Sequence, residues 1–334
     1  MSSLISILMP VKNAAPFLAA CLESILAQDE ENWELLAIDD HSSDSSRAIL
    51  ENYSQKEQRI KRYTNDGEGI IPALRKAYQK SKGKIIHRMD ADDLMPPKKL
   101  SRLKKELIKA GEGCLVSGKV EYFAKNGLND GYRRYADWLN QLIEQDNHWQ
   151  DIYKECVIAS PNWFIYRNDL DKVGAFNANR YPEDYDLVFR FYQAKLKVCS
   201  VKQLTHLWRD HEKRSSRTLE VYKNNDYLEL KWHYFKRLDY QSNRPLMIWG
   251  AGPKGKKLAK VLQQDQVDFE WVSNNPNKHG KEIYRQILAS FEKIVRTNNP
   301  QILVAVGQKG AQAKIKSFLH QQGHQQGRDY FFFC

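Results

Sequence analysis

The feature that most constrains the fold is a regular alternation of short apolar runs and helix-period segments in the N-terminal region. Apolar runs that fit buried strands occupy residues 4–9, 33–38 and 84–89, with a short strand at 60–63. Helical segments occupy residues 16–27, a stretch capped by 42–44 that runs through Tyr53, and residues 70–81. Because strand–helix repetition builds a mostly parallel sheet, we predict an α/β fold with ligands beyond the carboxyl ends of the strands.

The first of these helices carries recognisable start signals. The Asn13 side chain is placed to cap it, and Pro16 fits its first turn, where the missing amide costs no hydrogen bond. The strand–turn–helix unit is therefore predicted to begin the domain.

Two domains are expected from the length of the chain. A chain of 334 residues exceeds one average domain, and 42% hydrophobic residues are typical of a folded protein. After a charged and aromatic stretch from Arg214 to Asn243, Pro245 opens a new strand–turn–helix unit. We predict a main α/β domain over residues 1–215, a helical connector over 216–243 and a small α/β domain over 244–334.

A glycine-rich turn, Gly250-x-Gly252-x-x-Gly255, follows the apolar run 246–249 in the small domain. Such turns let a pyrophosphate approach a helix N-terminus. The acidic residue that would bind a ribose about 20 positions later is missing, because the strand at 269–272 leads into serine and asparagine. The domain resembles the small Rossmann-like modules of sugar-biosynthesis proteins, and either a regulatory nucleotide site or a tight turn without a ligand fits the pattern.

Acidic clusters follow predicted strands or lie further along the chain, at Asp39-Asp40, Asp90-Ala91-Asp92-Asp93 and Glu183-Asp184. A D-x-D turn can present carboxylates to a hard divalent cation, which keeps positions for water and substrate phosphates. The alternative for an isolated aspartate such as Asp40 is a helix cap or turn hydrogen bond. In the second cluster, crowded carboxylates repel one another unless a cation or hydrogen bonds offset the repulsion, so we predict a Mg²⁺ or Mn²⁺ site there.

With these clusters in place, the sequence resembles the family 2 inverting glycosyltransferases, whose glycosyltransferase-A fold is a nucleotide-binding, mostly parallel sheet flanked by helices. The matching segments are residues 6–13 (SILMPVKN), 24–28 (SILAQ), 34–44 (ELLAIDDHSSD), 89–93 (MDADD), 181–187 (YPEDYDL) and 208–211 (WRDH). Each segment alone is a weak signal, whereas all of them in order are specific. The resemblance covers about residues 2–216.

The resemblance implies a role for each matching position. Pro10, Val11 and Asn13 would lie beside the nucleotide base, and Asp40 or Asp39 would hydrogen-bond the base or the ribose. Asp90 and Asp92 would hold the ribose and the metal-bound diphosphate, with Asp92 as the direct metal ligand and Asp93 orienting it. Arg209 and His211 would lie near the diphosphate, with His211 as a further candidate metal ligand, although a lone histidine is often structural. Asp184 would be the catalytic base.

The resemblance also implies acceptor contacts at Trp163 and Glu183. The face of Trp163 can stack on a sugar ring, but a position in the hydrophobic core suits a tryptophan equally well. Lys12 departs from the family pattern, which often has an aromatic residue before Asn13, and it reaches either a phosphate or solvent.

Charge and cysteine content suggest partners and location. The formal charge of +11, with a basic helical segment from Lys98 to Lys109, suits anionic partners. We expect a nucleotide-diphosphate sugar, with a UDP-sugar favoured, a glycan or lipid-linked acceptor and peripheral membrane contact, but no nucleic acid. Five scattered cysteines without C-x-x-C indicate neither disulfides nor zinc, and the run from Leu4 to Val11 is too short to span a membrane. These features favour a cytoplasmic protein, with a peripheral position at the inner face of the membrane.

Together these features predict an inverting, metal-dependent glycosyltransferase in surface polysaccharide or lipid-linked glycan synthesis. A nucleotidyltransferase would show a glycine-rich, basic loop after the first strand, and residues 9–15 contain no glycine. A non-catalytic nucleotide-sugar-binding regulator would lack the base or the metal cluster, and both are present. The missing acid after the glycine turn disfavours an NAD-dependent oxidoreductase.

Overall fold

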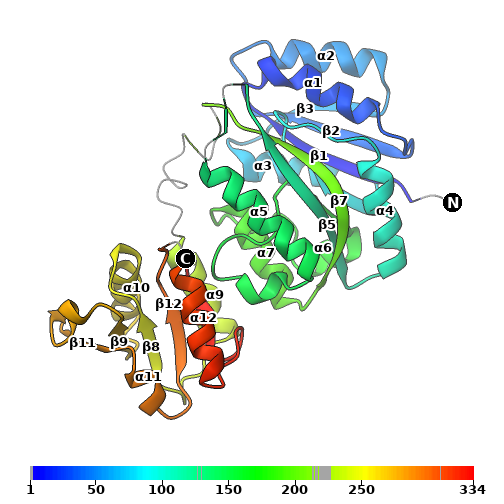
Figure 1. The fold of residues 1–334 in the computed structure, drawn as a ribbon. Coiled ribbons are helices and arrows are strands. Elements are labelled where there is room, and N and C mark those ends of the chain that lie inside the picture. The colour runs from blue at the N-terminus through cyan, green and yellow to red at the C-terminus, as the bar shows by residue number, and fades with distance from the viewer. Residues whose placement is uncertain are drawn as a thin grey trace. The chain divides into compact units, whose positions relative to one another are not determined.

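The computed structural model describes residues 3–125, 127–128, 130–212, 214, 217, 227–308 and 310–334. The chain forms two compact units, Met1–His148 with Val157–Lys223, and Trp149–Cys156 with Asn224–Cys334 (Figure 1). Each unit contains one sheet. Within the described ranges, no helix combines the length and the apolar character that crossing a bilayer requires.

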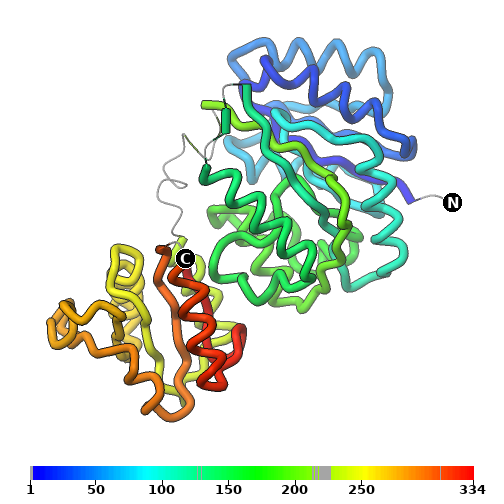
Figure 2. The backbone as a smooth tube through the Cα atoms, viewed as in Figure 1, coloured from blue at the N-terminus to red at the C-terminus, as the bar shows by residue number. Residues whose placement is uncertain are grey.

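The first unit is built on a seven-stranded sheet with the order β3-β2-β1-β4-β6-β5-β7. Its strands are β1 (Ile5–Val11), β2 (Trp33–Asp39), β3 (Ile60–Thr64), β4 (Ile85–Arg88), β5 (Cys114–Phe123), β6 (Trp163–Tyr166) and β7 (Lys197–Arg209). Only β6 runs antiparallel to its neighbours. The predicted α/β sheet is therefore confirmed, and β5 and β7, far apart in the sequence, run side by side (Figures 1 and 2).

Helices cover both faces of this sheet. They are α1 (Ala15–Leu26), α2 (Ser46–Lys56), α3 (Ile70–Lys80), α4 (Lys99–Ala110), α5 (Asp130–Gln145), α6 (Arg167–Lys172) and α7 (Glu183–Gln193). A 3-10 helix, η1 (His148–Asp151), lies at the point in the sequence where the first unit gives way to the second. Leucines of α1, α2 and α4 share one buried cluster with alternate residues of β1, including Ile5 and Ile7. Helix α3 contacts β1 and β2 outside that cluster, so it covers the opposite face.

The start of α1 differs from the predicted one. Ala14 is the N-cap and gives no side-chain hydrogen bond, whereas Pro16 lies in the first turn as predicted. Asn13 is not the cap, because its Oδ1 accepts a hydrogen bond from the Ser43 amide at 2.8 Å instead. Its side chain therefore joins the turn after β1 to the turn after β2.

The second unit contains a six-stranded sheet with the order β10-β11-β9-β8-β12-β13. Its strands are β8 (Leu246–Trp249), β9 (Glu270–Ser273), β10 (Glu282–Ile283), β11 (Gln286–Ser290), β12 (Gln301–Val304) and β13 (Tyr330–Phe332). Its helices are α9 (Leu228–Leu238), α10 (Pro253–Gln264), η3 (Pro276–Lys278), α11 (Lys293–Arg296) and α12 (Ala311–Gln321). All strand pairs except β10 with β11 are parallel, which fits the predicted Rossmann-like module.

The units differ from the expected domains in two respects. The segment Trp149–Cys156 belongs to the second unit, because the Tyr153 ring stacks on Phe333 with centroids 5.4 Å apart and meets Phe235 edge-on. Helix α9 of the expected connector belongs to this unit as well. Residues 218–226 of the connector lie outside the described residues.

Candidate active site

The carboxyl ends of β1, β2, β4 and β7 lie at one edge of the first sheet. Strands β2 and β4 both run parallel to β1, and two antiparallel pairings through β6 give β5 and β7 the same direction. Leu94, just past the D-A-D-D turn, exchanges backbone hydrogen bonds of 3.0 and 3.1 Å with Leu207 of β7. The turn after β4 is thereby attached to the strand that carries Arg209.

Asp40 follows β2 as a buried carboxylate with several donors. It accepts hydrogen bonds from Asn65 Nδ2 at 2.7 Å and from the Gly69 amide at 3.0 Å, and Lys12 Nζ lies 3.1 Å away. Burial acts to raise the pKa of Asp40, but these hydrogen bonds outweigh it and lower the pKa below its ordinary value. Lys12 thus contacts this carboxylate, and Asp40 fixes the loop after β3.

The other residues expected at the nucleotide lie close by in sequence and fold. Pro10 and Val11 end β1, and Val11 is buried. Asp39 ends β2 and is also buried. Asn13 has a positive φ of 50° and an exposed position between the two turns. All four lie at the carboxyl edge of the adjacent strands β1 and β2.

The carboxylates of the D-A-D-D turn have different surroundings. Asp90 is a quarter exposed, and Arg88 Nε donates to its Oδ1 at 3.0 Å. Burial and the charges of Asp92 and Glu183 raise the pKa of Asp90, against the opposing charge of Arg88. This carboxylate is therefore held by protein while one side stays open to a ligand.

Asp92 and His211 meet although 118 residues separate them in the sequence. His211 Nε2 lies 2.9 Å from Asp92 Oδ2, and both side chains are partly exposed, at 19% and 25%. Burial acts to raise the pKa of Asp92, but the contact with His211 and the charge of Arg214 lower it overall. The His211 ring packs on Phe17 with centroids 4.4 Å apart, which fixes its orientation.

Arg209 braces the same turn. Its Nε donates to the Asp92 carbonyl oxygen at 2.7 Å, and its backbone amide donates to Asp93 Oδ1 at 2.8 Å. The guanidinium lies over the rings of Phe17 and Phe123, 4.9 and 4.5 Å from their centroids. The residue expected near the diphosphate therefore also fixes the position of Asp92.

Asp92 and His211 form a donor set that suits a hard divalent cation. Mg²⁺ and Mn²⁺ accept carboxylate oxygens, imidazole nitrogen is a common ligand for transition metals, and Mg²⁺ is usually held by one or two carboxylates plus substrate phosphates. Within the described ranges, no three His, Cys, Asp or Glu residues are arranged to enclose a metal. A cation here would therefore complete its coordination with oxygens of water or of a substrate.

A buried polar chain lies beneath the turn. Asp93 Oδ2 is 3.0 Å from His206 Nε2, and His206 Nδ1 is 3.0 Å from Lys99 Nζ, with all three side chains buried. Lys99 also donates to the Pro161 carbonyl oxygen at 2.9 Å. Burial raises the pKa of Asp93, lowers that of His206 and lowers that of Lys99 to about 7. Asp93 thus anchors the turn and points away from solvent.

Arg88 joins the second and third acidic clusters. Its Nη1 donates to Glu183 Oε1 at 3.0 Å, while its Nε donates to Asp90. Both Arg88 and Glu183 are buried. Glu183 is thus engaged in this ion pair at the first residue of α7, which brings the start of that helix to the D-A-D-D turn.

Asp184 follows Glu183 in the first turn of α7. It is partly exposed, and its Oδ1 accepts a hydrogen bond from the Tyr185 amide at 2.8 Å. Burial and the charge of Glu183 raise the pKa of Asp184 to about 7, with Arg88 acting in the opposite direction. A carboxylate with this pKa is suited to accept a proton near neutral pH.

Trp163 lies in β6 with only 2% of its surface exposed, and its ring meets Phe191 edge-on at 6.1 Å. Of the two roles left open by the sequence, the structure gives it the core position, because a sugar cannot stack on a buried indole.

Sequence reasoning missed Arg88, His206 and Lys99. Arg88 and His206 lie within strands, and Lys99 begins α4, so all three looked like ordinary strand or surface residues. The one available signal was the charge of Arg88, two positions before Asp90, since an unpaired charge in an apolar strand is costly.

Known proteins share sequence and fold with this chain. The model of the glycosyl transferase family 2 matches residues 6–174. Glycosyltransferase GlyG of Streptococcus pneumoniae is 22% identical over 63% of this chain and 71% of its own length. Two further relatives, both from Bacillus subtilis, are matched over 61% and 40% of their own length.

Solved structures share the fold. TarS of S. aureus in complex with UDP-GlcNAc is 15% identical, with a TM-score of 0.57, over 78% of this chain and 71% of that chain. The mannosyltransferase PcManGT of Pyrobaculum calidifontis, in complex with GDP-Man and Mn²⁺, is 14% identical, with a TM-score of 0.52, over 78% and 69%. With the family model covering half of its length, this chain belongs to glycosyl transferase family 2.

Proposed function

We propose that the first unit transfers a sugar, with inversion, from a nucleotide-diphosphate sugar to an acceptor hydroxyl. The observation that carries this proposal is the pair of contacts made by Arg88, to Asp90 on one side and to Glu183 on the other. They bring the start of α7, with Asp184, to the turn that carries Asp92. In this proposal, the same edge of the sheet carries a site for the diphosphate and a carboxylate for the acceptor.

The donor nucleotide binds across the ends of β1 and β2. Asp40 holds the loop around Gly69 there, and Asp39, Asn13, Val11 and Pro10 lie at the same edge. A UDP-sugar is favoured, which the UDP-GlcNAc complex of the structural neighbour TarS supports. The GDP-Man complex of PcManGT makes a guanine nucleotide the second donor to test.

Asp92 and His211 would hold a Mg²⁺ or Mn²⁺ ion, with Asp90 close to the ribose and the metal-bound diphosphate. A bound cation stabilises the negative charge that grows on the leaving diphosphate, which lowers the barrier more than it stabilises the substrate. The Mn²⁺ complex of PcManGT supports this assignment. Arg209 holds the Asp92 backbone in place for this role.

Asp184 acts as the base. It accepts the proton of the acceptor hydroxyl while the hydroxyl oxygen bonds to the anomeric carbon, and the bond from that carbon to the diphosphate oxygen breaks. A single base on the face opposite the leaving group gives inversion, because no carboxylate bonds to the sugar. The raised pKa of Asp184, about 7, matches this role.

The acceptor is a glycan or a lipid-linked glycan at the cytoplasmic side of a membrane. The surface of α4 is less basic than the sequence suggests, because Lys99 is buried in the polar chain and Lys104 pairs with Glu30 at 2.6 Å. Lys98, Lys105 and Lys109 remain exposed there and are the candidates for peripheral contact with acidic lipids.

A panel of nucleotide sugars, each incubated with Mn²⁺ or with EDTA, tests the proposal through release of the nucleoside diphosphate. We expect one donor to be consumed in a metal-dependent manner by the wild type and not by Asp184→Asn. A different outcome would be a nucleotide sugar that raises the thermal stability of the wild type, while the wild type consumes it no faster than Asp184→Asn does. The chain would then be a nucleotide-sugar-binding regulator.

A further inference from the structure

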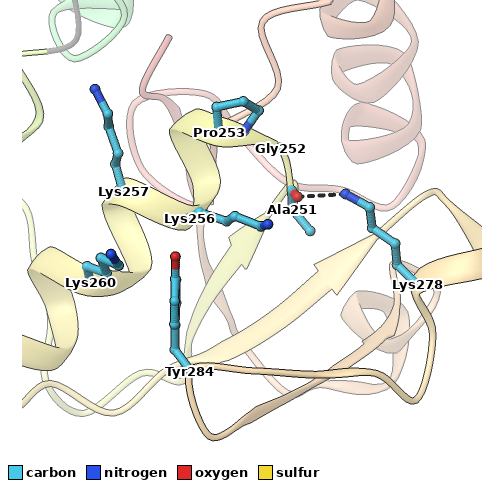
Figure 3. Close-up of a pocket in the computed structure, with 8 residues that line it drawn as sticks. All are labelled: Ala251, Gly252, Pro253, Lys256, Lys257, Lys260, Lys278 and Tyr284. Carbon is cyan, nitrogen blue, oxygen red and sulfur yellow. Dashed lines mark hydrogen bonds between the residues drawn. The ribbon is translucent and has the colours of Figure 1, made fainter.

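The second unit has a pocket of about 360 Å³ where α10 begins (Figure 3). It is lined by Ala251, Gly252, Pro253, Lys256, Lys257, Lys260, Lys278 and Tyr284. Half of these residues are lysines and none is acidic. The volume lies within the range of small-molecule sites, about 300 to 1,000 Å³. The lining therefore favours an anion.

The lysines approach the pocket from two segments. Lys278, at the end of η3, donates from Nζ to the Ala251 carbonyl oxygen at 2.7 Å. Figure 3 shows Lys256 extending from α10 toward the same turn, whereas Lys257 points away. The Lys260 Nζ lies 5.0 Å from the centroid of the Tyr284 ring, which orients it along the pocket wall. Three ammonium groups are thus available around one hollow.

The positions of these lysines lower the intrinsic stability of helix α10. The N-terminus of a helix carries a positive partial charge, yet α10 has no acidic residue in its first turn, which contains Lys254 and Lys256. Lys256 and Lys260, four residues apart, also repel each other. The Lys256 ammonium has no hydrogen-bond or ion-pair partner among the residues that the structure describes. Local rules broken without compensation are typical of binding sites.

The fold requires glycine at two of the three glycine positions of the turn but not at the third. Gly250 has a φ of +123°, and a Cβ on Gly255 would lie 1.9 Å from the Gly250 carbonyl oxygen, so the fold needs both. Gly252 has a φ of −81° and a ψ of −172°, which any residue can adopt, and a Cβ there would meet nothing within 4 Å. The fold alone does not require glycine at 252, where a side chain would occupy open space beside the lysines.

We propose that this pocket binds a phosphate or diphosphate ester, with Lys256, Lys260 and Lys278 around the phosphate oxygens. The first-turn amides of α10, which no side chain caps, donate to the same oxygens. The end of β9 offers Ser273 and no carboxylate for a ribose diol, so the ligand is not an NAD-type dinucleotide. The site lies in the second unit and stands whether or not the first unit transfers sugar.

Isothermal titration of the full chain in EDTA, with inorganic pyrophosphate as the probe, tests the site. The pair Lys256→Ala/Lys260→Ala is expected to weaken pyrophosphate binding about tenfold or more, because charge-assisted hydrogen bonds are lost. Gly252→Asp is expected to abolish binding by placing a carboxylate in the pocket. The same change supplies an N-cap to α10, so thermal stability should be maintained or raised.

Two controls separate this site from other effects. The pair Lys314→Ala/Lys316→Ala removes the same charge from α12 and should leave binding unchanged, as should Asp92→Asn in the first unit. The proposal would be overturned if the wild type did not bind pyrophosphate. It would also be overturned if either control lost binding and the lysine pair of α10 did not lose more.

Titrations of the wild type and of the α10 lysine pair with phosphate, UDP and NAD⁺ identify the source of the phosphate group. If UDP binds more tightly than pyrophosphate and its binding depends on the α10 lysines, the ligand is a nucleotide. If the two affinities are equal, the site recognises the phosphate groups alone. If NAD⁺ binds most tightly, the assignment to a phosphate or diphosphate ester is overturned.

Discussion

Arg88 donates a hydrogen bond of 3.0 Å to Glu183 across 95 positions of sequence, and both side chains are buried. One strand end and one helix start are joined by this ion pair. A buried pair broken on one side leaves a charge without compensation, whereas replacing both partners by apolar residues removes that cost. The pair is therefore suited to hold two segments in a fixed relation.

Arg88→Met is expected to destabilise the first unit by about 3 to 5 kcal/mol, because the buried Glu183 carboxylate loses its ion pair with Arg88. The double variant Arg88→Met/Glu183→Met should recover most of that stability but not sugar transfer, since Asp90 would remain without its donor. Denaturant unfolding and product formation measure the two effects. Equal stability of the single and double variants would contradict a role for this ion pair.

Asp92→Asn is expected to weaken Mn²⁺-dependent nucleotide binding by about tenfold or more, because a neutral amide is a poor ligand for a hard cation. Titration with UDP or GDP, with and without Mn²⁺, measures the change. His211→Ala should act in the same direction. The matched control is Asp29→Asn, which changes an exposed carboxylate outside the cluster and should bind like the wild type.

Asp184→Asn should lower kcat by about 100-fold to 10,000-fold while donor binding stays close to that of the wild type. Only the capacity to accept a proton is removed. Single-turnover transfer and donor titration separate the two quantities. An unchanged kcat would assign the base to another residue.

The rate of transfer is expected to rise with pH through about 7, because Asp184 must lose its proton to act as a base and its pKa is raised to about 7. Burial is the first cause of that shift and the charge of Glu183 the second. Glu183→Gln removes the second cause, so its pH profile should move to lower pH. A profile that moves to higher pH would contradict this account.

Lys99→Met tests the buried chain through the pH dependence of stability. The pKa of Lys99 is lowered from 10.5 to about 7 in the folded protein, so between these values the unfolded chain binds more protons. The contribution of Lys99 to folding stability therefore increases as pH rises from about 7 to 10.5. Denaturant unfolding across this window should show a steeper rise for the wild type than for the variant. Parallel curves would contradict the assignment.

The sequence correctly predicted those elements whose hydrophobic pattern or motif lies within a few neighbouring residues. Apolar runs and helical periods located β1, β2, β4 and the helices between them, and the order of motifs located the acidic turns. The cap assigned to Asn13 was wrong, because a hydrogen bond to Ser43, 30 positions away, competes with local capping. The segment Trp149–Cys156 was assigned to the first domain, because no local pattern reveals that Tyr153 packs on Phe333.

The sequence alone determined the fold class, the family and the set of carboxylates, since periodicity and motif order are properties of the chain. Only the tertiary structure decided which of those carboxylates stay open and which are engaged. Arg88 forms an ion pair with Glu183, which is 95 positions away. The contacts of His206 with Asp93 and of His211 with Asp92 join side chains that are even further apart in the sequence. The protonation and exposure of a side chain depend on its neighbours in space, and these neighbours exist only once the sheet has formed.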